Sequence, residues 1–185
     1  MGSEARAVMN QEIFRKLMGA MSRPGRLFRL GTVCKEPLMD ILNVLLDHEV
    51  GFCVTGADSD TLGRLINAET GAKAVDISQA DYVITPAEGI GDELFRAKMG
   101  SLEYPDKGAT IIYYGAKPAE NGKFIFAGPG VPDGGISFDP GIPDDEIKKL
   151  AEINSGFPLG VDAVIVCEKP ALICMPRSLK ITGGK

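Results

Sequence analysis

The sequence predicts an α/β fold in which helices cover both faces of a mixed β-sheet. Two features support this prediction. Short, wholly apolar runs such as residues 51–55 are typical of strands that are buried on both faces. Segments with the apolar spacing of a helix alternate with these runs in the first half of the chain, and pairs of runs joined by turn residues follow in the second half. The length of 185 residues suits about one domain.

One helix and one strand are expected near the start of the chain. Asn10 can cap the helix, whose apolar residues recur at helical spacing until the turn-rich residues 22–25. Residues 26–30 then read as a strand. We therefore expect a flexible N-terminus over residues 1–9 and a single domain over residues 10–178.

Helices and strands alternate through the middle of the chain. Pro37 suits the first turn of a second helix. After the apolar run 51–55, Asp58 or Ser59 can cap a third helix that ends near residue 68. Before residue 100 we also expect two short strands and a further helix, over 74–77, 82–85 and 91–99.

The second half predicts two antiparallel pairs of strands. Residues 109–114 and 123–127 surround turn residues and indicate a first hairpin-like pair. Residues 161–167 and 172–175 indicate a second hairpin, which leaves residues 179–185 as a C-terminal tail.

A long ordered loop is expected between these two pairs. Residues 128–143 contain too many glycines and prolines for regular structure. Asp144 can then cap a helix over residues 144–154.

Charge and the N-terminus limit the classes of partner. The net charge is −5 at pH 7, whereas nucleic-acid and anionic membrane surfaces need a basic footprint. Residues 1–10 lack a basic segment followed by an apolar one, and no run approaches the roughly 20 apolar residues of a membrane span. We expect a cytoplasmic protein that binds neither nucleic acid nor membrane.

The cysteines and the histidine do not indicate a metal centre or a catalytic dyad. Four cysteines stand singly among apolar neighbours, which predicts buried reduced thiols: Cys34, Cys53, Cys167 and Cys174. His48 follows an apolar helix, where capping or a solvent-facing position explains it better than catalysis. We therefore expect no metal and no catalytic residue.

Arginines near turns are the candidates for anion binding. Arg23 and Arg26 flank a Pro-Gly turn, and Arg177 follows Pro176 at a strand end. In an acidic chain the alternative is an ordinary ion pair with Asp or Glu. The segment Gly128–Pro129–Gly130 resembles a phosphate loop only in its glycines, and a rigid turn is the plainer interpretation because proline lacks an amide donor.

Several segments together resemble the PhnH family, whose members are subunits of the carbon-phosphorus lyase core complex. The segments cover about residues 10 to 178 in the family's order: Phe14–Gly25, Gly108–Thr110, Gly128–Gly130, Phe157–Asp162 and Pro176–Arg177. One departure is Ser178, where the family usually has threonine; serine keeps the hydroxyl.

The resemblance implies a fold like the large domain of pyridoxal-phosphate transferases without the cofactor, and a homodimer. It also implies a subunit of alpha-D-ribose 1-methylphosphonate 5-triphosphate synthase, which couples a phosphonate to the ribose of ATP and displaces adenine. Four scattered cysteines offer no iron-sulfur ligation pattern, so we expect no cofactor.

Two hypotheses for the function follow. The first is a non-catalytic or accessory subunit that docks other core subunits, is required for phosphonate catabolism and contacts the phosphonate or the ribosyl triphosphate. The second is an independent enzyme or sensor that binds a phosphonate or phosphate anion in a cleft at the dimer interface. The candidate anion ligands are Arg23, Arg26, Gly128, Gly130, Arg177 and Ser178.

Overall fold

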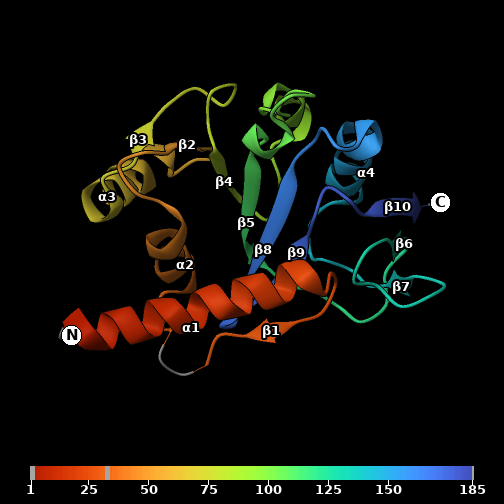
Figure 1. The fold of residues 1–185 in the computed structure, drawn as a ribbon, viewed down its shortest axis with the longest axis horizontal. Coiled ribbons are helices and arrows are strands. Elements are labelled where there is room, and N and C mark those ends of the chain that lie inside the picture. The colour runs from red at the N-terminus through yellow and green to blue at the C-terminus, as the bar shows by residue number, and fades with distance from the viewer. Residues whose placement is uncertain (1–2, 32–33, 185) are drawn as a thin grey trace.

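A seven-stranded sheet forms the centre of the computed structural model, which describes residues 3–31 and 34–184. The strand order is β1-β9-β8-β5-β4-β2-β3, seen in Figure 1. The strand bounds, in that order, are Phe28–Arg29, Ala171–Met175, Asp162–Cys167, Thr110–Ala116, Tyr82–Pro86, Gly51–Val54 and Lys73–Ala74.

The sheet is mixed, as the sequence predicts. Strands β3, β2, β4, β5 and β8 run parallel to one another. Strand β9 is antiparallel to β8, and β1 is antiparallel to β9. The predicted hairpin of residues 161–167 with 172–175 is confirmed as the β8–β9 pair.

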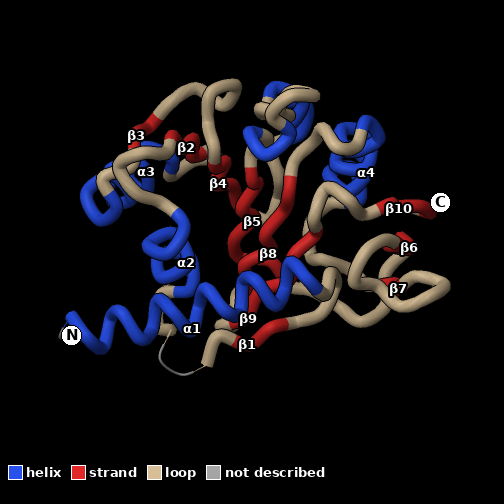
Figure 2. Tube along the Cα trace, viewed as in Figure 1, coloured by secondary structure: helices blue, strands red, loops and turns tan. Residues whose placement is uncertain are grey.

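Three helices cover one face of the sheet: α1 (Ser3–Ser22), α2 (Pro37–Leu45) and α3 (Ser59–Thr70). Figure 2 shows these helices together on one side of the molecule. Pro37 is in the first turn of α2, as expected, and Gly71 ends α3 with the positive φ of 75° that glycine favours. The core on this face is formed by apolar residues of the helices and strands, including Ile13, Leu17, Ile41, Leu42, Phe52, Ile66, Ile84, Ile112 and Val164.

Short helices and a small second sheet cover the other face. The helices are η1 (Gly91–Arg96), η2 (Pro105–Lys107), α4 (Asp144–Ile153) and η3 (Asn154–Gly156). The small sheet has the order β10-β6-β7, with bounds Lys180–Gly183, Phe124–Ala127 and Ile136–Ser137. The core on this face of the large sheet includes Val83, Leu94, Ile111, Tyr113, Phe126, Ile147, Leu150 and Ile165. Because successive side chains of a strand alternate in direction, β5 supplies Ile112 to one core and its neighbours to the other.

The expected pairing of residues 109–114 with 123–127 is wrong. Strand β5 lies between β4 and β8 and is parallel to both. Strand β6 instead pairs with β10 and β7 in the small sheet. A run as apolar as β5 needs cover on both faces, and the centre of the large sheet provides that cover.

The start of the first helix is also corrected. Helix α1 begins at Ser3, and Asn10 lies inside it rather than at its cap. Met9 is buried in the core between the helices and the sheet, so the turns before Asn10 are held by packing. Residues 4–9, assigned by the sequence to a flexible N-terminus, are therefore part of a helix.

Three smaller expectations are also modified. Pro143 occupies the N-cap of α4, and Asp144 is its first residue. The expected helix over 91–99 is the 3₁₀ helix η1, which ends at Arg96. The expected C-terminal tail includes β10, which pairs with β6. None of the described helices combines the length and apolar character needed to cross a membrane.

Candidate functional site

The predicted anion ligands Arg23 and Arg26 lie on the turn that follows α1. Both side chains are exposed. Neither makes an ion pair with any residue that the structure describes. These two guanidinium groups are therefore available to an external partner.

The glycines of residues 128–130 serve close packing. Gly130 has a φ of 79° and lies against Ser22, so an added Cβ would collide with the Ser22 carbonyl oxygen. A Cβ on Gly128 would lie 3.0 Å from the carbonyl oxygen of Ser178. The loop thus packs between the end of α1 and the segment after β9, which agrees with the interpretation as a rigid turn.

Arg177 is committed to an internal ion pair. Its Nη2 and Nε donate to Oδ2 of Asp162 at 2.6 Å and 3.1 Å, and its backbone N–H donates to Oδ1 at 2.8 Å. Its Nη1 donates to the carbonyl oxygen of Pro105 at 2.6 Å, and Nη2 also approaches that of Gly108 at 3.4 Å. For this arginine, the ion-pair alternative left open by the sequence is confirmed.

The six predicted ligands do not converge on one site. Arg177 and Ser178 line a hollow of about 450 Å³ beside β10, together with Pro129 and Phe157. Arg23 and Arg26 are not among the residues that line it. Arg177 and Ser178 thus share a hollow that the two free arginines do not line, and the 128–130 loop contacts both the residues before Arg26 and the residues after Arg177.

A second hollow, of about 610 Å³, lies where β5 and β8 end. Its walls are mainly apolar and include Leu27, Phe138, Cys167 and Ile173. Four charged residues also line it, Lys117, Glu120, Glu168 and Lys169, of which Lys117 and Glu168 approach to 3.5 Å. The carboxyl ends of parallel strands are the usual ligand-binding edge of an α/β sheet, so this hollow has the place and size for a small molecule.

Sequence reasoning missed this hollow because it assigned residues 117–122 to a hairpin turn. The available signal was the position of Lys117–Pro118 directly after a strand with no polar alternation. A strand buried on both faces is typical of a parallel sheet, and the residues that follow it then lie at the ligand-binding edge.

A buried carboxylate, Glu146, fixes the loop after β4. Its exposed fraction is 2%. Its Oε1 accepts the backbone N–H groups of Ile90 at 2.7 Å and Gly91 at 2.5 Å, and its Oε2 accepts the hydroxyl of Tyr113 at 2.9 Å. Burial and the neighbouring Glu146 raise the pKa of Tyr113 well above its usual value. With its oxygens occupied in this way, Glu146 acts as a structural acceptor that ties α4, β5 and the loop together.

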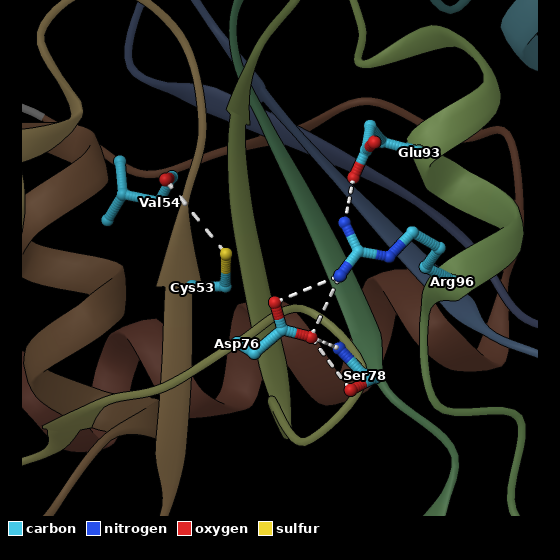
Figure 3. Close-up of polar contacts among 6 residues, drawn as sticks. All are labelled: Cys53, Val54, Asp76, Ser78, Glu93 and Arg96. Carbon is cyan, nitrogen blue, oxygen red and sulfur yellow. Dashed lines mark hydrogen bonds and ion pairs between the residues drawn. The ribbon is translucent and has the colours of Figure 1, made fainter.

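A surface cluster around Arg96 joins η1 to the segment after β3. Figure 3 shows Arg96 between Glu93 and Asp76. Nη1 donates to Glu93 Oε2 at 2.5 Å, and Nη2 donates to the two Asp76 oxygens at 3.1 Å and 3.0 Å. Hydrogen bonds from Ser78, with Arg96 beside it, lower the pKa of Asp76, and the bond to Glu93 raises the pKa of Arg96. Two carboxylates neutralise this guanidinium, so the cluster fastens two loops.

The thiols are protonated at neutral pH. Cys34, Cys167 and Cys174 are buried and Cys53 is partly buried, and all four are free of disulfides. Burial raises the pKa of Cys34 to about 12 and that of Cys167 to about 11. Burial also raises the pKa of Cys53, seen beside the Arg96 cluster in Figure 3, and that of Cys174. None of these thiols carries the lowered pKa of a nucleophilic cysteine.

The side chains that could bind a metal ion are scattered over the described structure. Within residues 3–31 and 34–184, no three His, Cys, Asp or Glu side chains come together in a metal-binding arrangement. His48 is exposed, in agreement with the solvent-facing position expected from the sequence.

Comparison with known proteins places the chain in a family. A family model described as a bacterial phosphonate metabolism protein, PhnH, matches residues 2–182. A putative C-P lyase subunit protein HtxG from Stutzerimonas stutzeri is 30% identical over 179 residues, which cover 95% of this chain and 87% of the relative. The alpha-D-ribose 1-methylphosphonate 5-triphosphate synthase subunit PhnH from Rhizobium meliloti is 28% identical over 180 residues, which cover 92% and 89%. This chain is a member of the PhnH family.

Proposed function

We propose that the chain is an accessory subunit of the carbon-phosphorus lyase core complex, alpha-D-ribose 1-methylphosphonate 5-triphosphate synthase, and that organic phosphonate catabolism requires it. The observation that carries this proposal is the match of nearly the whole chain to relatives that are themselves named as subunits of this system. Because the match extends over nearly the whole chain rather than one segment, it favours for this protein the same subunit role that the relatives have.

The contacts of the charged residues support an accessory role. Arg177 and Arg96 are each neutralised by carboxylates of the same chain. Glu146 is occupied by backbone amides and a phenol, and the pKa of each thiol is raised. The groups best suited to chemistry are thus used to hold the fold, whereas the free arginines lie on the surface. We infer that the chain contributes docking surface rather than reacting groups.

The proposal includes several further properties, inferred from the family resemblance or from the sequence. The chain forms a homodimer and a single PhnH-like domain, acts in the cytoplasm without a cofactor, and has the fold of the large domain of pyridoxal-phosphate transferases. Contact of Arg23, Arg26, Gly128, Gly130, Arg177 or Ser178 with the phosphonate or the ribosyl triphosphate remains a prediction. The independent enzyme or sensor is less favoured, because both relatives are named as subunits.

Co-expression with the other core subunits tests the proposal. A tagged chain should purify as a stoichiometric complex whose mass, measured by light scattering, exceeds that of the chain alone. A strain lacking the gene should fail to grow on methylphosphonate as sole phosphorus source, and should recover when the gene is restored. A chain that purifies alone from the full set of subunits, in a strain whose growth does not depend on it, would overturn the proposal.

A further inference from the structure

The charges of the chain are strongly segregated. Residues 1–35 contain seven of the 20 basic residues but only two of the 25 acidic residues, Glu4 and Glu12. This segment therefore carries +5, and residues 36–185 carry −10. The segment consists mainly of α1, the turn after it and β1, so the positive charge is carried by this helix and the residues that directly follow it.

Most of this positive charge has no internal partner. Arg6 pairs with Glu69 at 3.4 Å. The six other basic residues make no ion pair with any residue in the described part of the chain: Arg15, Lys16, Arg23, Arg26, Arg29 and Lys35. All six are exposed except Lys16, which is partly buried. In a chain with an excess of carboxylates, leaving these cations unpaired favours a charged partner from outside.

Two large apolar side chains lie among these charges. Phe14 is 49% exposed and Met18 is 56% exposed, one helical turn apart on α1. The core-facing side of the same helix is formed by other residues, Ile13, Leu17 and Ala20. Figure 1 shows α1 along the lower edge of the molecule, with α2 above it and β1 below it. An apolar centre with a charged rim rich in arginine is the common composition of a protein–protein interface.

We propose that Phe14, Arg15, Met18, Arg23 and Arg26, here called the α1 face, bind an acidic surface of another subunit of the complex. This inference rests on the proposed function, because it names the surface by which the chain enters the assembly. The acidic groups of the partner would pair with the arginines, and an apolar area of the partner would cover Phe14 and Met18.

The charge of the α1 face argues against a second copy as the occupant. In a symmetric dimer the same patch lies on both sides of the contact, so its unpaired arginines would face one another. Like charges placed in contact cost several kcal/mol. The homodimer therefore uses another surface.

Two other kinds of occupant are less suitable. A helix that lies on a membrane needs a broad apolar face. Four apolar residues of α1, Met9, Ile13, Leu17 and Ala20, are instead buried in the core, and the large apolar residues left exposed on it are Val8, Phe14 and Met18, with charged residues among them. Nucleic acid would meet the net charge of −10 on the rest of the chain. An acidic protein surface fits the apolar pair and the basic rim together.

Charge reversal on and off the α1 face tests the inference. The test variant is Arg15→Glu/Arg26→Glu, and the matched control is Lys73→Glu/Lys148→Glu, which changes the charge equally at exposed positions elsewhere. A third variant, Phe14→Ser/Met18→Ser, removes the apolar centre. Each is co-expressed with the other core subunits, and its affinity for the purified remainder of the complex is measured by titration at low and high salt. Circular dichroism and light scattering of each variant alone check its fold and self-association.

The expected result is specific to the face. Arg15→Glu/Arg26→Glu and Phe14→Ser/Met18→Ser should each bind the remainder at least about tenfold more weakly, with unchanged fold and self-association. Lys73→Glu/Lys148→Glu should bind as the wild type does, and added salt should weaken wild-type binding.

The remaining outcomes overturn the inference in distinguishable ways. Normal binding by all variants would reject the α1 face and leave the proposed function intact. Equal losses in the test and control variants would show that overall charge is responsible. A change in self-association caused by Arg15→Glu/Arg26→Glu would assign the face to a second copy. Binding of the free chain to RNA or anionic vesicles, lost in the same variant, would assign it to those ligands. Absence of wild-type binding would reject the proposed function and the α1 face with it.

Discussion

Arg177 and Asp162 close the open end of the β8–β9 hairpin. Asp162 is the first residue of β8, and Arg177 lies two residues after Met175, the last residue of β9, so their contact at 2.6 Å joins the two strand ends. The same guanidinium binds carbonyl oxygens of Pro105 and Gly108, which precede β5. One side chain thus holds together three chain segments at this edge of the sheet.

Replacing Arg177 with alanine should destabilise the fold. Asp162 Oδ2 and two carbonyl oxygens would lose their side-chain donors in a partly buried position, although Oδ1 would keep the backbone N–H of residue 177. This loss should lower the free energy of unfolding by about 2–4 kcal/mol. Urea denaturation measures this change. The exposed and unpaired Arg23 is the control, and Arg23→Ala should remain within about 0.5 kcal/mol of the wild type. Loss of phosphonate growth by Arg177→Ala at native stability would instead assign Arg177 to a ligand site.

Gly108 should be intolerant of any side chain. Its φ of −66° suits all residues, but an added Cβ would collide with Nη1 of Arg177 and with the carbonyl oxygen of Gly160. We expect Gly108→Ala to cost about 1–3 kcal/mol, because Arg177 or the backbone would have to move. Gly156 has open space at the corresponding position, so Gly156→Ala is the matched control and should unfold like the wild type. Equal stability of both variants would contradict the packing described for Arg177.

The Tyr113–Glu146 hydrogen bond should be visible in stability and in its dependence on pH. Tyr113→Phe removes the donor to Oε2 and should lower the free energy of unfolding by about 1 kcal/mol. Because the pKa of Tyr113 is raised in the folded state from its ordinary value of 10.0, the unfolded chain releases this proton first as pH rises. The stabilisation is therefore complete below pH 10 and declines above it. The free energy of unfolding, measured by urea denaturation at several pH values from neutral to strongly alkaline, should therefore decrease less steeply with pH for Tyr113→Phe than for the wild type.

The raised pKa values of the buried thiols should lower the stability of the fold from a lower pH than Tyr113 does. Folding raises the pKa of Cys167 from 9.0 to about 11 and that of Cys34 from 9.0 to about 12. Above pH 9 the unfolded chain loses these protons while the folded chain keeps them, so stability should fall from pH 9 towards pH 11. Cys167→Ala should reduce this slope. An unchanged slope would mean that the thiol titrates alike in both states.

Accessibility gives a separate test of the thiols. In the native protein at neutral pH, a thiol reagent such as dithionitrobenzoate should modify Cys53 first, because it is the one cysteine of the four that is not fully buried. Cys53→Ala should abolish this first phase. A fast phase that persists in Cys53→Ala would show that another thiol becomes exposed.

Local patterns predicted the elements better than their pairing. The apolar run of β2, the first-turn proline of α2 and the β8–β9 hairpin could be read from the sequence because each depends on neighbouring residues. The neighbours of β5 could not be read in this way. Turn residues after an apolar run fit either a hairpin or an exit from a parallel sheet, and the contacts that decide between them come from distant segments.

In the candidate site, too, contacts between residues far apart in the sequence could not be predicted. The sequence identified Arg177 as a residue near a turn at a strand end but could not show that it binds Asp162. Glu146 gave no signal at all, because it stands in a charged helical run and is buried only through contacts with Tyr113 and the loop after β4. The segregation of charge into residues 1–35 was visible in the sequence, but its meaning depends on the described fold, in which Arg6 pairs with Glu69 while the other basic residues of this segment make no ion pair.

The pairing of β1 with β9 has a consequence for synthesis on the ribosome. Phe28 pairs with Leu172, which is made 144 residues later, or roughly 7 to 30 seconds later at ordinary rates of translation. Helix α1 packs on the same strand β9 as well as on α2, so during that interval α2 is available to it but the strand that completes its packing is missing. A nascent chain that stops before residue 171 contains every helix of the fold, yet it lacks the strand on which the first of them rests.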